Sequence, residues 1–146
     1  MNPLKATHVV DDARVVISDR DAMIREMNPR VVSGVFTFAT VPQRESVPHD
    51  LNVFATVVEN EGLSVVIAYN DADRLGLTDP VQLGWITLTV NSSLEGVGLT
   101  AAVSGELAQS GIACNVIAGH HHDHLLVPID RVDESVALLT ALARQR

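Results

Sequence analysis

The amino-acid sequence predicts an α+β fold in which helices cover one face of antiparallel sheets. Two observations support this prediction. Apolar, β-branched segments such as residues 63–69 alternate with segments in which apolar residues recur at helical spacing, such as residues 132–142. From residue 85 onward the segments follow the order strand, helix, strand, strand, helix. The 146 residues suffice for one compact domain or for two small ones that share a core.

The first part of the chain is predicted to hold a leader, a short helix and a strand. Residues 1–16 are weakly patterned, and their apolar pairs are compatible with either a short strand or a loose leader. Ser18 is the expected N-cap of the helix, which a proline follows at position 29. Residues 34–41 are β-branched and aromatic and end at Pro42, which predicts a strand.

The middle of the chain is predicted to form a helix and then a buried strand. The apolar spacing predicts a helix over residues 50–60, capped by its first residue and ended at Gly62. Residues 63–69 are nearly all apolar, which is typical of a strand buried on both faces. Residues 57–69 resemble residues 106–119 as helix, glycine and strand, which indicates either an internal duplication or a coincidence of common elements.

The last part of the chain is predicted to be the most regular. A strand is expected over residues 85–91, a long helix over 92–111 and a strand over 112–119. A tight hairpin then leads into a strand over residues 124–129, and Asp130 caps the final helix. The long helix is expected to carry two apolar stripes, one made of Leu94, Val97, Ala101, Gly105 and Ala108 and the other of Leu99, Val103 and Leu107.

The order of elements predicts a ferredoxin-like plan that lacks its last strand. Residues 34–69 give an earlier unit that is also incomplete, so the two units are expected to complete one another's sheet. The predicted organisation is a leader over residues 1–16, a first half over 17–80 and a second domain over 81–146. The fold prediction is therefore a tandem pair of βαββα units that share antiparallel sheets.

Composition excludes several classes of function. The net charge is −8 and no lysine follows Lys5, so the chain offers no basic patch for nucleic acid or anionic membranes. No apolar run approaches the roughly 20 residues of a membrane span, and no signal-peptide stretch occurs. The single cysteine, Cys114, is expected to be a buried thiol rather than a nucleophile. We therefore expect a cytoplasmic protein, and no enzyme motif suggests catalysis.

A run of histidines near the predicted hairpin is a candidate metal site. If this run were extended, His120, His122 and His124 would project to one side, as a ligand set for zinc, nickel or copper does. The alternative is the polar turn of a hairpin, because neither a nearby cysteine nor a second histidine cluster accompanies the run.

The junction at residues 91–98 is the stronger candidate for a binding site. A strand is expected to end there and a glycine-containing helix to begin, so backbone N–H groups and the helix dipole favour a bound carboxylate. Ser92 and Ser93 add hydroxyl groups. Plain helix capping and close packing of the glycines explain the same pattern equally well.

Residues 85–139 resemble the ACT-domain proteins of the small tandem type. The resemblance rests on the block "SSLEGVGLTAAVSGELAQSGI" and on the "HDHL" and "VP" that follow it, and it extends over residues 17–143. The chain is also similar to the ACT modules of aspartate kinases and of eukaryotic arginine sensors. The resemblance implies a tandem pair of ACT-like folds that associates into a homodimer or a larger oligomer.

The resemblance also implies a ligand site, because ACT domains commonly bind amino acids at an interface between modules. In this chain Ser-Leu-Glu-Gly replaces the frequent Pro-Gly of the binding loop, which leaves the ligand open. The residues implied as ligand contacts are Asn91, Ser92, Ser93, Leu94, Glu95, Gly96, Val97 and Gly98 of the loop, and Asn115, Val116 and Ile117 of the facing strand.

Three functional hypotheses follow. The first is a non-catalytic regulatory protein that binds a small molecule, an amino acid above all, and needs no cofactor. The second is an assembly module that pairs with itself or another protein without a ligand. The third is a metal-binding protein that uses His120, His122 and His124.

Overall fold

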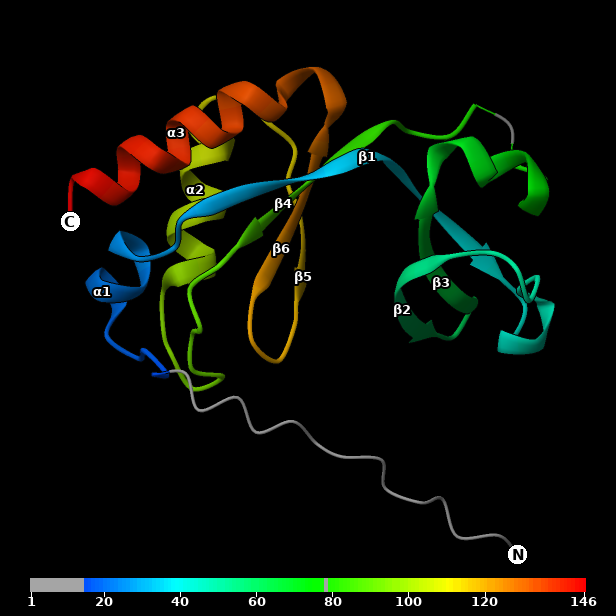
Figure 1. Ribbon diagram of the computed structural model, residues 1–146, viewed down its shortest axis with the longest axis horizontal. Helices are drawn as coiled ribbons and strands as arrows, with labels where there is room; N and C mark the ends of the chain where they lie inside the picture. Colours follow the sequence, from blue (N-terminus) through cyan, green and yellow to red (C-terminus); the bar gives the residue numbers. More distant parts are fainter. Residues whose placement is uncertain (1–14, 78) are drawn as a thin grey trace, which may run out of the picture.

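The computed structural model describes residues 15–77 and 79–146. In this part of the chain, one antiparallel sheet of six strands has the order β2-β3-β1-β4-β6-β5 (Figure 1). The strands are β1 Pro29–Val41, β2 Val53–Glu59, β3 Gly62–Ala68, β4 Leu83–Leu88, β5 Asn115–Ala118 and β6 Asp123–Pro128. The α-helices are α1 Arg20–Arg25, α2 Leu99–Gln109 and α3 Val132–Arg144, and the 3-10 helices are η1 Arg44–Ser46, η2 Tyr69–Leu75 and η3 Ile129–Arg131.

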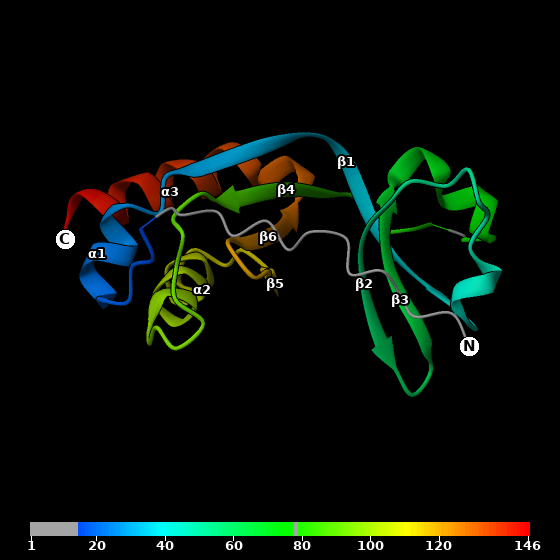
Figure 2. The same ribbon diagram turned by 60° about the horizontal axis from the view of Figure 1, so that its bottom comes forward.

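Strand β1 joins the two ends of the sheet. Its later part pairs with β3 and its earlier part pairs with β4. The register shifts between Val32 and Phe36, and Gly34 within this irregularity has a φ of 123°, which favours glycine. Figure 2 shows that β1 bends sharply and that β2 and β3 turn away from β4 and β6. Because β1 supplies the strand that the second unit lacks, the predicted ferredoxin-like pair with a shared sheet is confirmed.

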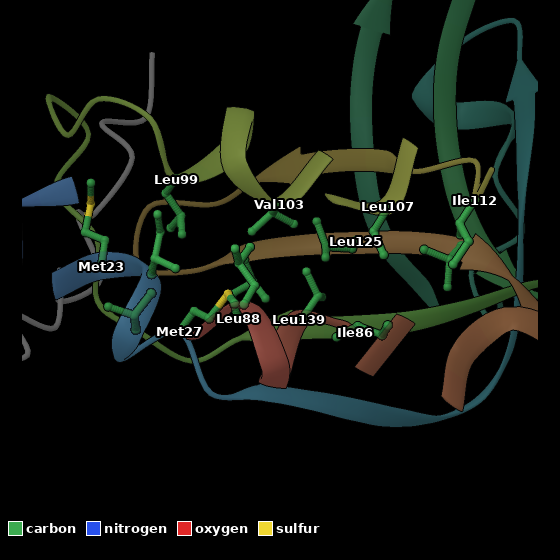
Figure 3. Close-up of a cluster of buried hydrophobic side chains, with 14 of the residues drawn as sticks. Met23, Met27, Ile86, Leu88, Leu99, Val103, Leu107, Ile112, Leu125 and Leu139 are labelled. Carbon is green, nitrogen blue, oxygen red and sulfur yellow. The ribbon is translucent and has the colours of Figure 1, made fainter. Parts of the chain in front are cut away.

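The three α-helices gather on one face of β4, β5 and β6 and bury the largest core (Figure 3). Ile86 and Leu88 alternate along β4 toward this face, as the predicted strand requires. Helix α2 adds Leu99, Val103 and Leu107, which confirms the second of its two predicted stripes. Helix α3 is confirmed too, but Asp130 lies in η3 and no side chain caps α3.

The predicted helix over residues 50–60 is wrong, because this segment contains strand β2. Valine, phenylalanine and threonine dominate the segment, and these residue types favour a strand when a partner strand is adjacent. Strand β3 follows after a turn at residues 60–61 and pairs with β2. Gly62, predicted to end a helix, instead has a φ of 142° beside β1, where an added Cβ would lie 2.5 Å from the Val41 carbonyl oxygen. The helix-glycine-strand correspondence between residues 57–69 and 106–119 is therefore also wrong, because residues 57–59 belong to a strand.

Several boundaries differ from the prediction, among them those of β4, observed over residues 83–88 rather than 85–91, and of β5, observed over 115–118 rather than 112–119. Helix α1 is capped by the Asp19 side chain, which accepts a hydrogen bond from the Ala22 amide, so Ser18 is not its N-cap. Strand β1 begins at Pro29 rather than at residue 34. Residues 92–98 form a loop before α2, and Leu94 and Val97 are largely exposed, so the first predicted stripe is wrong. Most of the predicted leader, residues 1–14, lies outside the described residues.

The opposite face of the sheet carries a second apolar layer whose buried side chains come from the strands. Phe36 of β1 and Trp85 of β4 pack edge to face with ring centroids 5.4 Å apart. The ring centroid of Phe54 in β2 lies 6.2 Å from that of Trp85, although β2 and β4 are not neighbours in the sheet. The sheet therefore curls around this aromatic cluster and shields most of it from solvent.

Candidate functional site

The loop at residues 91–98 is held by a segment that precedes α1. The Ile17 amide donates to the Asn91 carbonyl oxygen at 2.9 Å, and the Ser93 amide donates to the Ile17 carbonyl oxygen at 2.8 Å. Within the loop, the Glu95 amide donates to Ser93 Oγ and the Gly96 amide to the Ser93 carbonyl oxygen. Several of the backbone donors expected at this junction are thus used inside the chain, and fewer are left for a ligand than the sequence predicts.

The glycines of the loop allow α1 to approach closely. A Cβ on Gly96 would lie 2.8 Å from Met23 Sδ, and one on Gly98 would lie 2.8 Å from Arg20 Cδ. Gly98 also has a φ of 103° at the N-cap of α2. Close packing at the start of the helix, one of the two explanations offered for the glycines, accounts for both positions.

The histidine-rich segment forms the turn between β5 and β6, as the hairpin prediction requires. The Gly119 amide donates to the His122 carbonyl oxygen at 2.9 Å and closes the turn. His122 Nδ1 lies 3.0 Å from the Val90 carbonyl oxygen, so this side chain ties the turn to the end of β4. The rings of His120 and His121 stack with centroids 4.6 Å apart.

Two adjoining cavities lie between the loop and the turn. They share Ser92, Ser93 and Leu94 in their walls. The outer cavity has a volume of about 440 Å³ and is also lined by Val16, Asn91, Glu95, His120 and His121. The inner cavity has a volume of about 120 Å³ and is also lined by Met23, Gly96, Leu99, Thr100, Ala118, Gly119 and Asp123.

Most of the loop residues predicted to contact a ligand line these two cavities, whereas the predicted residues of strand β5 do not. Residues 91–96 line these cavities, but neither Val97 nor Gly98 does. Residues 115–117 of β5 line neither cavity, and Asn115 Nδ2 donates to the Leu126 carbonyl oxygen. The sequence analysis did not single out Asp123 and Thr100 as site residues. The "HDHL" pattern was the available signal, because it places an acid at the start of an otherwise apolar strand.

Asp123 is the buried acid of this region, with 9% of its surface exposed. Burial raises the pKa of its carboxyl above the ordinary value, and the charges of the neighbouring His124 and His122 oppose this shift. The Thr100 hydroxyl also opposes it through a hydrogen bond to the carboxylate. A buried carboxylate with a hydroxyl partner alone retains unused capacity to accept hydrogen bonds.

The histidines proposed as metal ligands do not converge. His124 lies on the aromatic face, where its Nδ1 is 3.2 Å from Trp85 Nε1 and 3.0 Å from Thr87 Oγ1. Because indole N–H only donates, Nδ1 of His124 accepts, and burial lowers the pKa of this imidazole. Within residues 15–77 and 79–146, no group of three or more metal-ligating side chains is placed to hold an ion.

Two further findings concern the single cysteine and the lengths of the helices. Cys114 is a half-buried free thiol, and burial raises its pKa, which makes it a poor nucleophile at neutral pH. No helix in the part of the chain that the structure describes is long and apolar enough to cross a membrane.

ACT-domain family models match nearly the whole described chain. One matches residues 17–82 and another matches residues 81–141, and both describe an ACT domain. The curated proteins include no significant match to the chain.

Solved structures share this architecture. A protein of unknown function from Vibrio cholerae, described as a possible transport protein, is 39% identical over 82% of this chain and 92% of its own, with a TM-score of 0.73. A protein from Agrobacterium tumefaciens is 20% identical over 79% of this chain and 87% of its own, with a TM-score of 0.63. The regulatory subunit of aspartate kinase from Thermus flavus is 7% identical over 79% of this chain and 96% of its own, with a TM-score of 0.56. At these identities the last two show the fold alone.

Proposed function

Because the chain belongs to the ACT-domain family and carries two of these domains in tandem, we propose that it is a non-catalytic regulatory protein that binds an amino acid. ACT domains are regulatory modules that generally bind small effectors, and this coarser role follows from membership of the family. The identity of the effector, the cytoplasmic location and the boundary between residues 80 and 81 are parts of the proposal.

The observation that carries the proposal is the pair of adjoining cavities between residues 91–96 and the turn at 118–123. Hydroxyl, imidazole and carboxylate groups line them together with apolar side chains, as small-molecule sites require. The inner cavity extends beneath the start of α2, where Leu99 and Met23 are buried. A small polar ligand fits this combination better than a large apolar one.

A hollow of similar size lies in the other half of the molecule. Its volume is about 460 Å³, and it is lined by residues 42–44 and 58–63. The charged residues in its lining are Arg44, Glu59 and Glu61. All three are exposed, so water screens their charges. It lacks the buried acid of the first site and is the weaker candidate.

A thermal-shift screen of the twenty amino acids tests the proposal. At a concentration of about 100 times its Kd, a ligand adds about 2.7 kcal/mol of stability. In a protein of this size that corresponds to an increase in Tm of about 5–10 °C. Ser92→Ala should weaken binding of the effective amino acid in calorimetry, because Ser92 lines both cavities.

Ser33→Ala is the matched control, because Ser33 is exposed in β1 and lines neither cavity. This variant should bind like the wild-type protein. Absence of any shift with all twenty amino acids would contradict the proposed effector class. Equal binding by both variants would contradict the proposed location.

The second candidate function is assembly without a ligand, which we propose would occur through a homodimer. Two observations favour it. An added Cβ on Gly105 of α2 meets nothing within 4 Å, so no contact with the described residues explains a glycine there. Val58 of the sheet-edge strand β2 is 86% exposed, and an exposed edge strand readily pairs with another chain.

Light scattering with and without the effective amino acid separates the two candidates. Assembly through β2 predicts a dimer that Val58→Glu converts to a monomer. Val81→Glu is the control, because Val81 is an exposed valine outside the strands. A dimer that survives Val58→Glu would exclude this edge as the interface.

A further inference from the structure

The carboxylate of Asp123 is buried in the wall of the inner cavity, and no basic side chain of residues 15–77 or 79–146 forms a salt bridge with it. The hydroxyl of Thr100 lines the same cavity and favours the charged form of this carboxylate, which lowers its pKa. The salt bridges among the described residues join other carboxylates to arginines, and none of them includes Asp123. Buried carboxylates are normally paired with a cation, because removing an unpaired charge from water is costly.

Neither neighbouring histidine forms a salt bridge with Asp123 among the described residues. His124 accepts the Trp85 N–H with its Nδ1, which is the arrangement of a neutral imidazole. His122 directs its Nδ1 at the Val90 carbonyl oxygen rather than at a carboxylate. The groups that face the inner cavity from α1 and α2 are the thioether of Met23, the side chain of Leu99 and the hydroxyl of Thr100.

We propose that Asp123 receives the ammonium group of a bound amino acid and thereby selects amino acids over carboxylic acids that lack an amine. This inference rests on the proposed function and assigns the orientation and chemical class of the ligand at that same site. The inner cavity of about 120 Å³ takes the ammonium end. The carboxylate end lies toward the outer cavity, where Ser92 and the stacked rings of His120 and His121 offer hydrogen-bond donors.

This orientation also accounts for an acid at a position that an apolar residue would fill at no electrostatic cost. Asp123 pairs with Leu88 of β4 and Ala118 of β5 in the sheet register, so its neighbours on both strands are apolar. In the absence of a ligand, the buried charge opposes folding. In its presence, the ammonium group compensates the charge, and the hydrogen bond is charge-assisted.

Calorimetric titration of three matched ligands tests the inference. The ligands are the amino acid that gives the largest thermal shift, its α-hydroxy acid analogue and its N-acetyl derivative. The proteins are the wild type, Asp123→Asn and the control Asp133→Asn, which alters an exposed acid of α3. Wild type and control should bind the amino acid about 10- to 100-fold more tightly than the two analogues, as expected for a hydrogen bond to a charged group. Asp123→Asn should lose this preference.

Several outcomes would overturn the inference. If Asp123→Asn kept the full preference for the amino acid, Asp123 would not receive the ammonium, and the proposed function would still stand. If no amino acid bound the wild type, the proposed function itself would fail. If potassium or sodium chloride alone stabilised the wild type but not Asp123→Asn, the occupant would be a metal cation and the ammonium assignment would be wrong.

A measurement on the wild-type protein covers the case in which Asp123→Asn does not fold. The carboxyl carbon resonance of Asp123 reports its protonation in NMR spectra recorded across pH. The ligand's ammonium should lower the pKa of this carboxyl relative to the free protein. An unchanged titration curve at saturating amino acid would overturn the assignment.

Discussion

The two ends of the sheet use similar strands but are covered in different ways. At one end, three α-helices lie on β4, β6 and β5 and bury a large continuous core (Figure 3). At the other end, β2 and β3 are covered by 3-10 helices and loops around a smaller core that includes Val65 and Ile67. Large side chains of β2, among them Phe54 and Val58, remain partly or largely exposed.

This difference separates the proposed tasks of the two ends. At the helix-covered end, two cavities lie between the loop that precedes α2 and the turn that joins β5 to β6. These cavities are the proposed ligand site. A sheet end with little helical cover leaves an apolar edge that another chain can pair with. Strand β1 pairs with strands of both ends and makes one sheet of the two halves.

The largest predicted effect concerns core leucines in the two ends. Leu125→Ala in β6 removes a side chain that is 1% exposed beneath the helix layer, and we expect a loss of about 3–5 kcal/mol in the free energy of unfolding. Leu63→Ala in β3 alters the smaller core, and we expect a loss of about 2 kcal/mol. Urea unfolding measures both, and equal losses would contradict the difference in cover.

A pair of glycine substitutions gives a smaller effect and tests the corrected middle segment. Gly62→Ala should cost about 1–3 kcal/mol, because its φ of 142° and the nearby Val41 carbonyl oxygen exclude a side chain. Gly105→Ala should stabilise the monomer by about 0.5–1 kcal/mol, because it lies in a helix with open space beside it. A Gly105→Ala protein that lost affinity for its own copies would indicate that α2 packs against a second chain.

The smallest predicted effect is a pH dependence caused by His124. Burial lowers the pKa of His124 in the folded protein below the ordinary value of 6.5, so the unfolded chain takes up a proton at higher pH. The stabilising contribution is present above the unfolded pKa and is lost as pH falls through the folded pKa. His124→Gln should therefore lose less stability than the wild type between about pH 7.5 and 5.5.

His49→Gln is the control for this pH dependence, because His49 is exposed. Trp85, the chain's single tryptophan, contacts His124 and provides the fluorescence signal for unfolding. If His124→Gln and His49→Gln showed the same change with pH, His124 would not be the source.

The sequence predicted the helix over residues 99–109 and its buried stripe because the periodicity there is unambiguous. Leu99, Val103 and Leu107 recur at helical spacing and are buried together. Residues 53–59 were wrongly predicted as a helix, because valine and phenylalanine at this spacing are compatible with a helix or a strand. Pairing with β3 stabilises the strand, and the sequence alone does not reveal this pairing. The loop at 91–98 was predicted as part of the site, but Asp123 was not, because its burial depends on the approach of α2 and Met23.

The most direct test of the account is to map the bound amino acid on the protein by NMR. Amide resonances of an isotope-labelled sample are followed as the amino acid from the screen is added. The account predicts shifts concentrated in residues 92–96 and 118–123 and at Thr100. Shifts concentrated instead in residues 42–44 and 58–63, around the hollow of the other half, would contradict it.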